Sequence, residues 1–83
     1  MDSQIIDLSR LPAGCLGTVI SINSQGKEKD RFIDLGFAPS RKVKTLFKSP
    51  AQNPIAYEVM GAVLALRSED ASKIMIRTGS QPL

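Results

Sequence analysis

The sequence predicts a mainly β protein, a small barrel of five to six short strands with one inserted helix. Two observations lead to this prediction. Short runs of alternating apolar and polar residues are typical of strands with one buried face. Turn residues, chiefly glycine and proline, separate these runs roughly every eight to twelve positions. We expect a barrel because closing the sheet removes exposed strand edges. The chain has 83 residues, which is enough for one domain (1–83) with one modest core.

The N-terminal part of the chain predicts one or two strands joined by a turn. Residues 5–8 form either a short first strand or an apolar arm. A turn follows at Leu11–Gly14, because Pro12 fixes φ and Gly14 is conformationally permissive. Residues 16–22 alternate in polarity and predict a half-buried strand. The residues expected to share one face of this strand are Leu16, Thr18, Ile20 and Ile22.

A short helix is predicted over about residues 27–35. Glu28 and Asp30 lie in its early turns, where the helix dipole favours acidic side chains. Ser24 or Gly26 is placed to cap its N-terminus.

The C-terminal end of this helix carries the strongest local signals in the chain. Gly36 comes where a helix needs a left-handed residue, and Pro39 follows where no helix can continue. Phe32 and Leu35 lie three residues apart, so we expect them to share a buried face that Phe37 covers.

The second half of the chain predicts three strands. Residues 41–47 and 55–60 alternate in polarity, and a proline-bracketed loop over 49–54 joins them. Gly61 then makes a tight hairpin to a returning strand over 62–67. The side chains expected on the apolar faces are Val43, Thr45 and Phe47 in one strand, and Ile55, Tyr57 and Val59 in the next.

The chain closes with a helical turn and a last strand. Ser68 is expected to cap a short helical turn near 68–72, again followed by acidic residues. Residues 73–77 form the last strand, with Ile74 and Ile76 pointing inward. The tail over 78–83 has nothing to bury, and we expect it to be frayed.

The composition excludes most enzyme classes. Histidine is absent, so the usual general base and the commonest metal ligand are both missing. The one cysteine, Cys15, forms no disulfide framework and fits a reducing compartment. No apolar run of about 18 residues exists, and the N-terminus lacks the order of a secretory signal. We predict a cytoplasmic protein that is not an enzyme.

A pair of acidic residues on the helix offers a weak metal site. Asp30 and Asp34 lie one helical turn apart and could both contact a hard cation. More often such a pair belongs to a solvated helix face, and Arg31 is expected to pair with Asp34. We therefore predict neither a bound metal nor a cofactor.

A basic set on one strand is the clearest surface signal. Its functional interpretation is a docking face for an acidic partner or for nucleic acid. The simpler interpretation, which we favour, is the solvated side of a strand on which lysine discourages aggregation. Few aromatic rings are available to stack on bases, so no nucleic acid is expected. The set is Arg41, Lys42, Lys44 and Lys48.

The ordered motifs of this chain resemble those of the FeoA family, small accessory proteins of bacterial ferrous-iron transport. The resemblance covers about residues 8–77, the predicted core of the domain. Its most specific part is the helix end and turn over residues 31–39. The other segments that carry it are Leu11–Gly14, Gly17–Ile22, Val43, the 49–54 loop, Gly61, Leu64–Arg67, Ala71 and Ile74.

The resemblance implies an SH3-like barrel and a non-enzymatic role. It implies binding to the cytoplasmic, GTP-binding side of the FeoB transporter in support of Fe(II) uptake. Exposed strand edges would also allow the chain to form a homo-oligomer, and the sequence does not decide its oligomeric state. The positions that the resemblance and the basic set together suggest for partner binding are Arg31, Asp34, Leu35, Gly36, Pro39, Arg41, Lys42 and Lys44.

Two departures from the family pattern affect this expectation. The family usually has glycine where Ser40 stands and an aspartate where Asn53 stands. We therefore expect the turn at Ser40 to differ in type, and Asn53 removes a charge from the 49–54 loop. Two other functions stay open beside the first. One is a metal-responsive regulatory domain, since iron-dependent repressors contain a similar barrel, with Glu28, Asp30 and Asp34 as ligands. The other is a small nucleic-acid-binding barrel.

Overall fold

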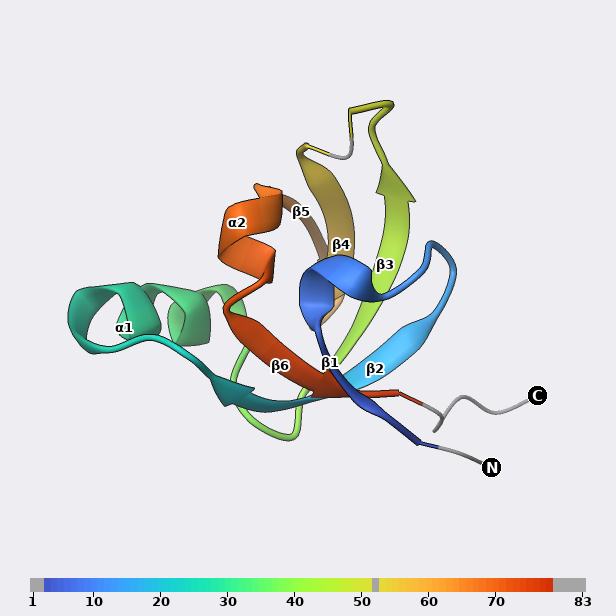
Figure 1. Ribbon diagram of the computed structural model, residues 1–83. Helices are drawn as coiled ribbons and strands as arrows, with labels where there is room; N and C mark the ends of the chain where they lie inside the picture. The colour runs from blue at the N-terminus through green and yellow to red at the C-terminus, as the bar shows by residue number, and fades with distance from the viewer. Residues whose placement is uncertain (1–2, 52, 79–83) are drawn as a thin grey trace.

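The computed structural model describes residues 3–51 and 53–78 and contains one antiparallel sheet of six strands. The strand order is β1-β6-β2-β3-β4-β5, and the sheet curls into a small barrel (Figure 1). Helix α1 projects from one side, and α2 lies above β6 in the view of Figure 1. The predicted mainly β fold is therefore confirmed. The strands are β1 (Ile5–Asp7), β2 (Leu16–Ile22), β3 (Lys42–Lys48), β4 (Ile55–Val59), β5 (Ala62–Leu66) and β6 (Ile74–Arg77), and the helices are η1 (Leu8–Arg10), α1 (Gly26–Leu35) and α2 (Ser68–Ala71).

The two ends of the described chain lie side by side. β1 pairs antiparallel with β6, so residues 5–8 begin as a strand, but Leu8 already starts the short 3₁₀ helix η1. The amide of Thr78 donates to the carbonyl of Gln4 at 2.8 Å. The prediction of a frayed tail is thus wrong for Thr78, and its remainder, 79–83, lies outside the described residues.

The core fills the inside of the curled sheet and extends under η1 and α1. Tyr57 and Phe37 are fully buried and meet edge to face, with ring centroids 6.4 Å apart. The Tyr57 hydroxyl donates to the carbonyl of Leu8 at 3.4 Å, and burial raises the pKa of this phenol well above its ordinary value. The hydrophobic cluster consists of Leu8, Leu11, Val19, Ile22, Phe32, Phe37, Val43, Ile55, Tyr57, Val59, Leu66, Ala71, Ile74 and Ile76.

The predicted buried face of strand β2 is wrong for most of its length. Gly17 and Val19 are buried, whereas Thr18 and Ile20 are only partly covered. An irregularity between Val19 and Ser21 shifts the pairing with β6. The shift turns Ile22 inward, so the two ends of the strand bury residues of different parity.

Strand β3 contains a second irregularity, and it reverses the prediction for Phe47. Val43 and Thr45 are buried as expected, but Phe47 is 64% exposed. The register with β4 shifts between Thr45 and Phe47, which places Phe47 opposite Ala56 on the outer face. The hydroxyl of Thr45 is buried without a hydrogen-bond partner among the described residues.

The β4–β5 hairpin agrees with its prediction. Ile55, Tyr57 and Val59 are buried, and Val59 pairs with Ala62 to close the hairpin. Its two loop residues, Met60 and Gly61, both have positive φ (53° and 79°), as type I′ hairpin loops require.

Helix α1 ends as the sequence predicts. Gly36 has φ 114°, its amide donates to Ile33 O, and the amide of Phe37 donates to Phe32 O. This double hydrogen bond is a Schellman motif, and burial of both phenylalanines supplies its usual hydrophobic contact. A Cβ atom at residue 36 would also lie 3.3 Å from two methyl groups of Val59, which is a tight contact.

Three details of the helical segments differ from the predictions. Leu35 is 38% exposed rather than buried, so Phe32 alone anchors α1 in the core. Gln25 is the N-cap residue of α1 and has no side-chain cap; the hydroxyl of Ser24 donates to Glu28 instead. Ser68 is the first residue of α2 rather than its cap, and its amide donates to the side-chain oxygen of Asn53 at 3.2 Å.

Candidate protein-interaction surface

Polar contacts attach α1 to the α2–β6 segment. Lys73 Nζ lies 2.9 Å from Glu28 Oε2, and the amide of Asn23 donates to the carbonyl of Lys73. The hydrogen bond from Ser24, followed by that from Lys73, lowers the pKa of the Glu28 carboxyl. Its partner Lys73 has a raised pKa, chiefly because of the same hydrogen bond to Glu28. These contacts fix the orientation of a helix that buries little apolar surface.

Arg31 forms a second link to α2, so the predicted Arg31–Asp34 pair is wrong. The guanidinium lies 3.7 Å from Asp70 Oδ2 and 5.0 Å from the centroid of the Phe32 ring. An arginine held over an aromatic ring gains a modest cation–π attraction. Asp34 is exposed and has no ion pair within residues 3–51 and 53–78.

The turn after α1 is a well-formed type II turn. The amide of Arg41 donates to the carbonyl of Ala38, Pro39 takes the second position and Ser40 the third, with φ 79°. Ser40 therefore keeps the geometry that glycine usually provides, and the expected change of turn type is wrong. Two backbone hydrogen bonds of 2.8 Å, from Ser40 N to Val19 O and from Val19 N to Arg41 O, hold this turn against β2.

The structure brings an apolar and a basic group together at this end of the barrel. Leu35 is 38% exposed and precedes Gly36, and the sulfur of Met60 lies 3.5 Å from the Cβ position of Gly36. Met60 is itself 64% exposed. Pro39, Arg41 and Lys42 are exposed on the adjoining turn and the start of β3. We name Leu35, Pro39, Arg41, Lys42 and Met60 the helix–turn surface.

Sequence reasoning missed Met60, and the dipeptide Met60–Gly61 is the signal that could have found it. A two-residue hairpin loop places both of its residues outside the ladder, so a methionine there is solvent-facing. The other two basic residues of β3, Lys44 and Lys48, do not belong to the helix–turn surface. Lys44 is partly buried, and Lys48 donates to Ser9 O at the far end of the strand.

The acidic residues do not gather into a metal site in the part of the chain that the structure describes. Asp30 and Asp34 are exposed on α1, and Glu28 is engaged by Ser24 and Lys73. No three carboxylate or thiol side chains of the described residues come together as ligands of one ion.

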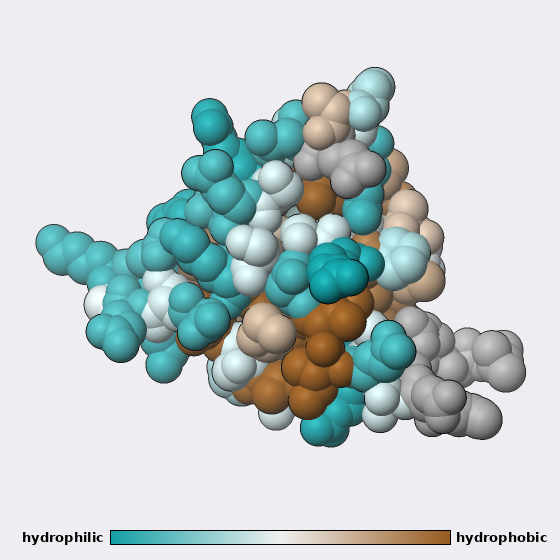
Figure 2. Space-filling model, in the orientation of Figure 1, coloured by the Kyte–Doolittle hydropathy of each residue, from teal (hydrophilic) through white to brown (hydrophobic). Residues whose placement is uncertain are grey.

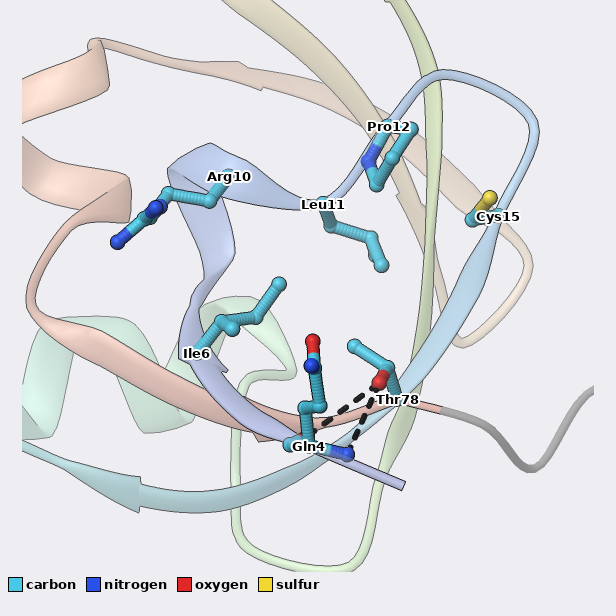
Figure 3. Close-up of a pocket in the computed structure, with 7 residues that line it drawn as sticks. All are labelled: Gln4, Ile6, Arg10, Leu11, Pro12, Cys15 and Thr78. Carbon is cyan, nitrogen blue, oxygen red and sulfur yellow. Dashed lines mark hydrogen bonds between the residues drawn. The ribbon is translucent and has the colours of Figure 1, made fainter. Parts of the chain in front are cut away.

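A shallow cleft lies beside β1. Its volume is about 290 Å³, and Figure 3 shows Arg10 pointing away from the other residues that line it. At the edge of the cleft, the Thr78 hydroxyl accepts a hydrogen bond from the amide of Gln4 and donates one to its carbonyl. Figure 2 shows brown, hydrophobic atoms gathered over β1, whereas α1 is mostly teal. The lining residues are Gln4, Ile6, Arg10, Leu11, Pro12, Cys15 and Thr78, a set without any carboxylate that could act as a base.

The strand order, the inserted helix and the turn define the class of this protein, a small SH3-like barrel. Its described residues contain no helix that is both long and apolar enough to cross a membrane. The model of the FeoA domain family matches residues 6–78, and the chain therefore belongs to this family. Membership in FeoA, a family of accessory proteins without enzymatic activity, agrees with the prediction that the chain is not an enzyme.

Individual relatives support the same family. A Porphyromonas gingivalis protein in which Fe(2+) transport protein A is fused to the Fe(2+) transporter FeoB is 28% identical over 69 residues. That match covers 83% of this chain but only 8% of the fused protein.

Solved structures agree with the fold. The FeoA protein of Chlorobium tepidum has a TM-score of 0.81 at 30% identity, over 88% of this chain and 70% of that one. The zinc complex of Stenotrophomonas maltophilia FeoA, described as a prokaryotic SH3 domain protein, has a TM-score of 0.76 at 25% identity, over 86% and 88% of the two chains. A manganese-dependent transcriptional repressor shares the fold alone, with a TM-score of 0.80 at 19% identity, over 94% of this chain and 44% of the repressor.

Proposed function

We propose that this protein is a cytoplasmic, non-enzymatic accessory protein of ferrous iron uptake. In this proposal its partner is the cytoplasmic, GTP-binding part of a FeoB-type membrane transporter, and the helix–turn surface makes the contact. The observation that carries the proposal is the P. gingivalis relative, in which an FeoA protein and the transporter are one polypeptide. Domains joined in one chain meet at a high effective concentration, which favours a direct contact between them.

The helix–turn surface has the composition of an interface. Leu35 and Met60 provide exposed apolar area next to Gly36, which is itself buried. Arg41 and Lys42 border this area, and the chain carries a net charge of +3. An apolar centre with a charged rim is the usual arrangement of a protein interface, and basic rim residues favour a partner with acidic side chains.

Calorimetric titration of the full chain against the purified cytoplasmic domain of the transporter tests this function. The titration is run without nucleotide, with GDP and with a non-hydrolysable GTP analogue. We expect binding in at least one of these states. Absence of detectable heat in all three, with pull-down also negative, would contradict the proposal.

Paired variants locate the contact. Leu35→Gln combined with Met60→Gln keeps side-chain volume but replaces apolar atoms with amides, and we expect affinity to fall about tenfold or more. Val63→Thr is the matched control, because Val63 is 65% exposed and is not one of the helix–turn residues. If both variants bind like the parent protein, the helix–turn surface is not the interface.

A further inference from the structure

Strand β5 is the exposed edge of the sheet that lacks protection. It ends the strand order, and within the described residues it pairs only with β4. All five of its residues are apolar, without a lysine, proline or bulge. Natural proteins use such devices to prevent edge-to-edge pairing. The other edge, β1, has three residues, includes Asp7 and continues into η1.

The backbone of β5 offers a regular set of hydrogen-bonding groups. Because a two-residue loop closes the hairpin at the Val59–Ala62 pair, this pair and every second pair beyond it are hydrogen-bonded. The pairs between them are Glu58–Val63 and Ala56–Ala65. The amide and carbonyl groups of Val63 and Ala65 therefore point away from β4, toward the open edge.

The side chains next to this edge form an apolar outer face. Val63 is 65% exposed and Phe47 is 64% exposed. The ladder aligns Phe47 of β3 with Ala56 of β4 and Ala65 of β5, and Ala56 is only 8% exposed. Glu58 and Lys44, also aligned in register, supply the charges beside this apolar row.

From these observations we infer that β5 pairs antiparallel with β5 of a second copy of this chain, forming a twofold-symmetric dimer. With the axis at Leu64, Val63 of one copy faces Ala65 of the other, and both present outward backbone groups. Arg67 then faces Gly61, where added atoms would meet nothing within 4 Å. The edge carries no charge, so its self-pairing does not bring like charges together although the chain is +3.

A contact of this size gives a weak dimer. A five-residue edge with one row of side chains is smaller than the standard interface of about 800 Å² per partner. We therefore expect dimerisation to depend on concentration, with dissociation in the micromolar-to-millimolar range. The seam ends at Gly61, next to Met60 of the helix–turn surface, but it uses the backbone of β5 and none of the five helix–turn residues. The dimer therefore goes beyond the proposed function and does not depend on it.

Sedimentation equilibrium of the full chain from about 10 µM to 1 mM tests the inference. We expect a reversible shift from monomer toward dimer. Val63→Lys places a charge on each side of the twofold axis, and Ala65→Pro removes an amide that β4 does not use. Each variant should remain monomeric across the range. Ile5→Lys is the matched control on the other edge strand, where Ile5 is 57% exposed, and it should dimerise like the parent.

Amide hydrogen exchange gives a second readout. Exchange at Val63 and Ala65 should slow as concentration rises in the parent protein and stay constant in Val63→Lys. A monomer at every concentration would overturn the inference. Two other outcomes would overturn it as well: dimerisation that Val63→Lys leaves intact, or a monomer in which Val63→Lys weakens only transporter binding, because β5 would then accept a strand of another protein.

Discussion

Helix α1 and the barrel are held in place by different forces. The inner face of the sheet is a continuous apolar core, to which β2, β3, β4, β5 and β6 all contribute buried side chains. Helix α1 buries one side chain, Phe32, and is otherwise fixed by the Glu28–Lys73 and Arg31–Asp70 ion pairs. Ion pairs between partly exposed side chains contribute little stability, typically ~0–1 kcal/mol each. The barrel thus supplies the stability of the fold, and α1 can present its exposed residues without weakening it.

Truncation of the single anchor of α1 should have the largest effect. Phe32→Ala removes a fully buried ring and should lower the free energy of unfolding by about 3–5 kcal/mol. Leu35→Ala, three residues away on the same helix, should cost well under that, about 1 kcal/mol or less, because Leu35 is partly exposed. Urea denaturation measures both values. Equal losses would show that α1 has no single anchor.

Removal of the unpaired hydroxyl in the core should stabilise the barrel. Thr45→Val keeps the shape of the side chain and removes a polar atom that is buried without a partner in the described structure, so we expect a gain of about 1–2 kcal/mol. Thr45→Ser retains the hydroxyl and loses the methyl group, and it should destabilise the protein. Thermal unfolding followed by circular dichroism compares the two variants. A stability loss in Thr45→Val would indicate a water or partner at this hydroxyl.

Replacing Ser40 with glycine in the turn that follows α1 should increase the stability of the protein. Ser40 has φ 79°, a conformation that costs a residue with a Cβ atom about 1 kcal/mol relative to glycine. Ser40→Gly should therefore raise stability by about that amount. Ser40→Ala has the same backbone cost and serves as the control in the same denaturant series. If alanine stabilises as much as glycine, the left-handed geometry of Ser40 is not the cause.

A smaller effect is expected from the Glu28–Lys73 contact, and it should depend on pH. The pKa of Glu28 is lowered, so its contribution to stability is present above the ordinary value of 4.5 and is lost as the pH falls through the folded-state pKa. The pKa of Lys73 is raised, so its contribution is present below 10.5 and is lost as the pH rises through its folded-state pKa. Glu28→Gln should differ most from the parent between these limits and match it at the acid extreme, whereas at alkaline pH the difference should shrink to the contribution of the Ser24 hydrogen bond. Unfolding curves from acid to alkaline pH, repeated at high salt to screen the pair, measure this difference.

No effect is expected from divalent metals. Asp30 and Asp34 are exposed, and no described group of three acidic or thiol side chains surrounds a site, so Fe(II) or Mn(II) should leave the melting temperature unchanged. Differential scanning calorimetry under anaerobic conditions measures this temperature. A shift that saturates with metal, and that Asp34→Asn abolishes, would restore the metal-responsive alternative.

The sequence predicted the elements of the fold better than the faces that they bury. Glycine, proline and alternation are local signals, so the end of α1 at Gly36 and the hairpin at Gly61 followed directly from them, although Met60 was assigned to the strand rather than to the loop. The exposure of Phe47 depends on an irregularity in the β3–β4 ladder, which is a property of two paired strands.

In the candidate surface, too, the residues with local conformational roles were predicted and those placed by packing between distant segments were not. Gly36 and Pro39 were recognisable from their conformational roles alone. The partner of Arg31 was not, because Asp70 is distant in sequence and is brought near only by the packing of α2. Met60 was missed for the same reason, because only the packing of the hairpin against the end of α1 places its sulfur next to Gly36.

The pairing of β1 with β6 has a consequence for protein engineering. Ile5 lies opposite Arg77, so the two ends of the barrel could be joined by a short peptide. New termini opened in the loop before β4, next to the exposed Ala51, would give a circularly permuted barrel with the same ladder. The same adjacency would let the domain be inserted as a cassette into a surface loop of a host protein, with both connections entering from one side.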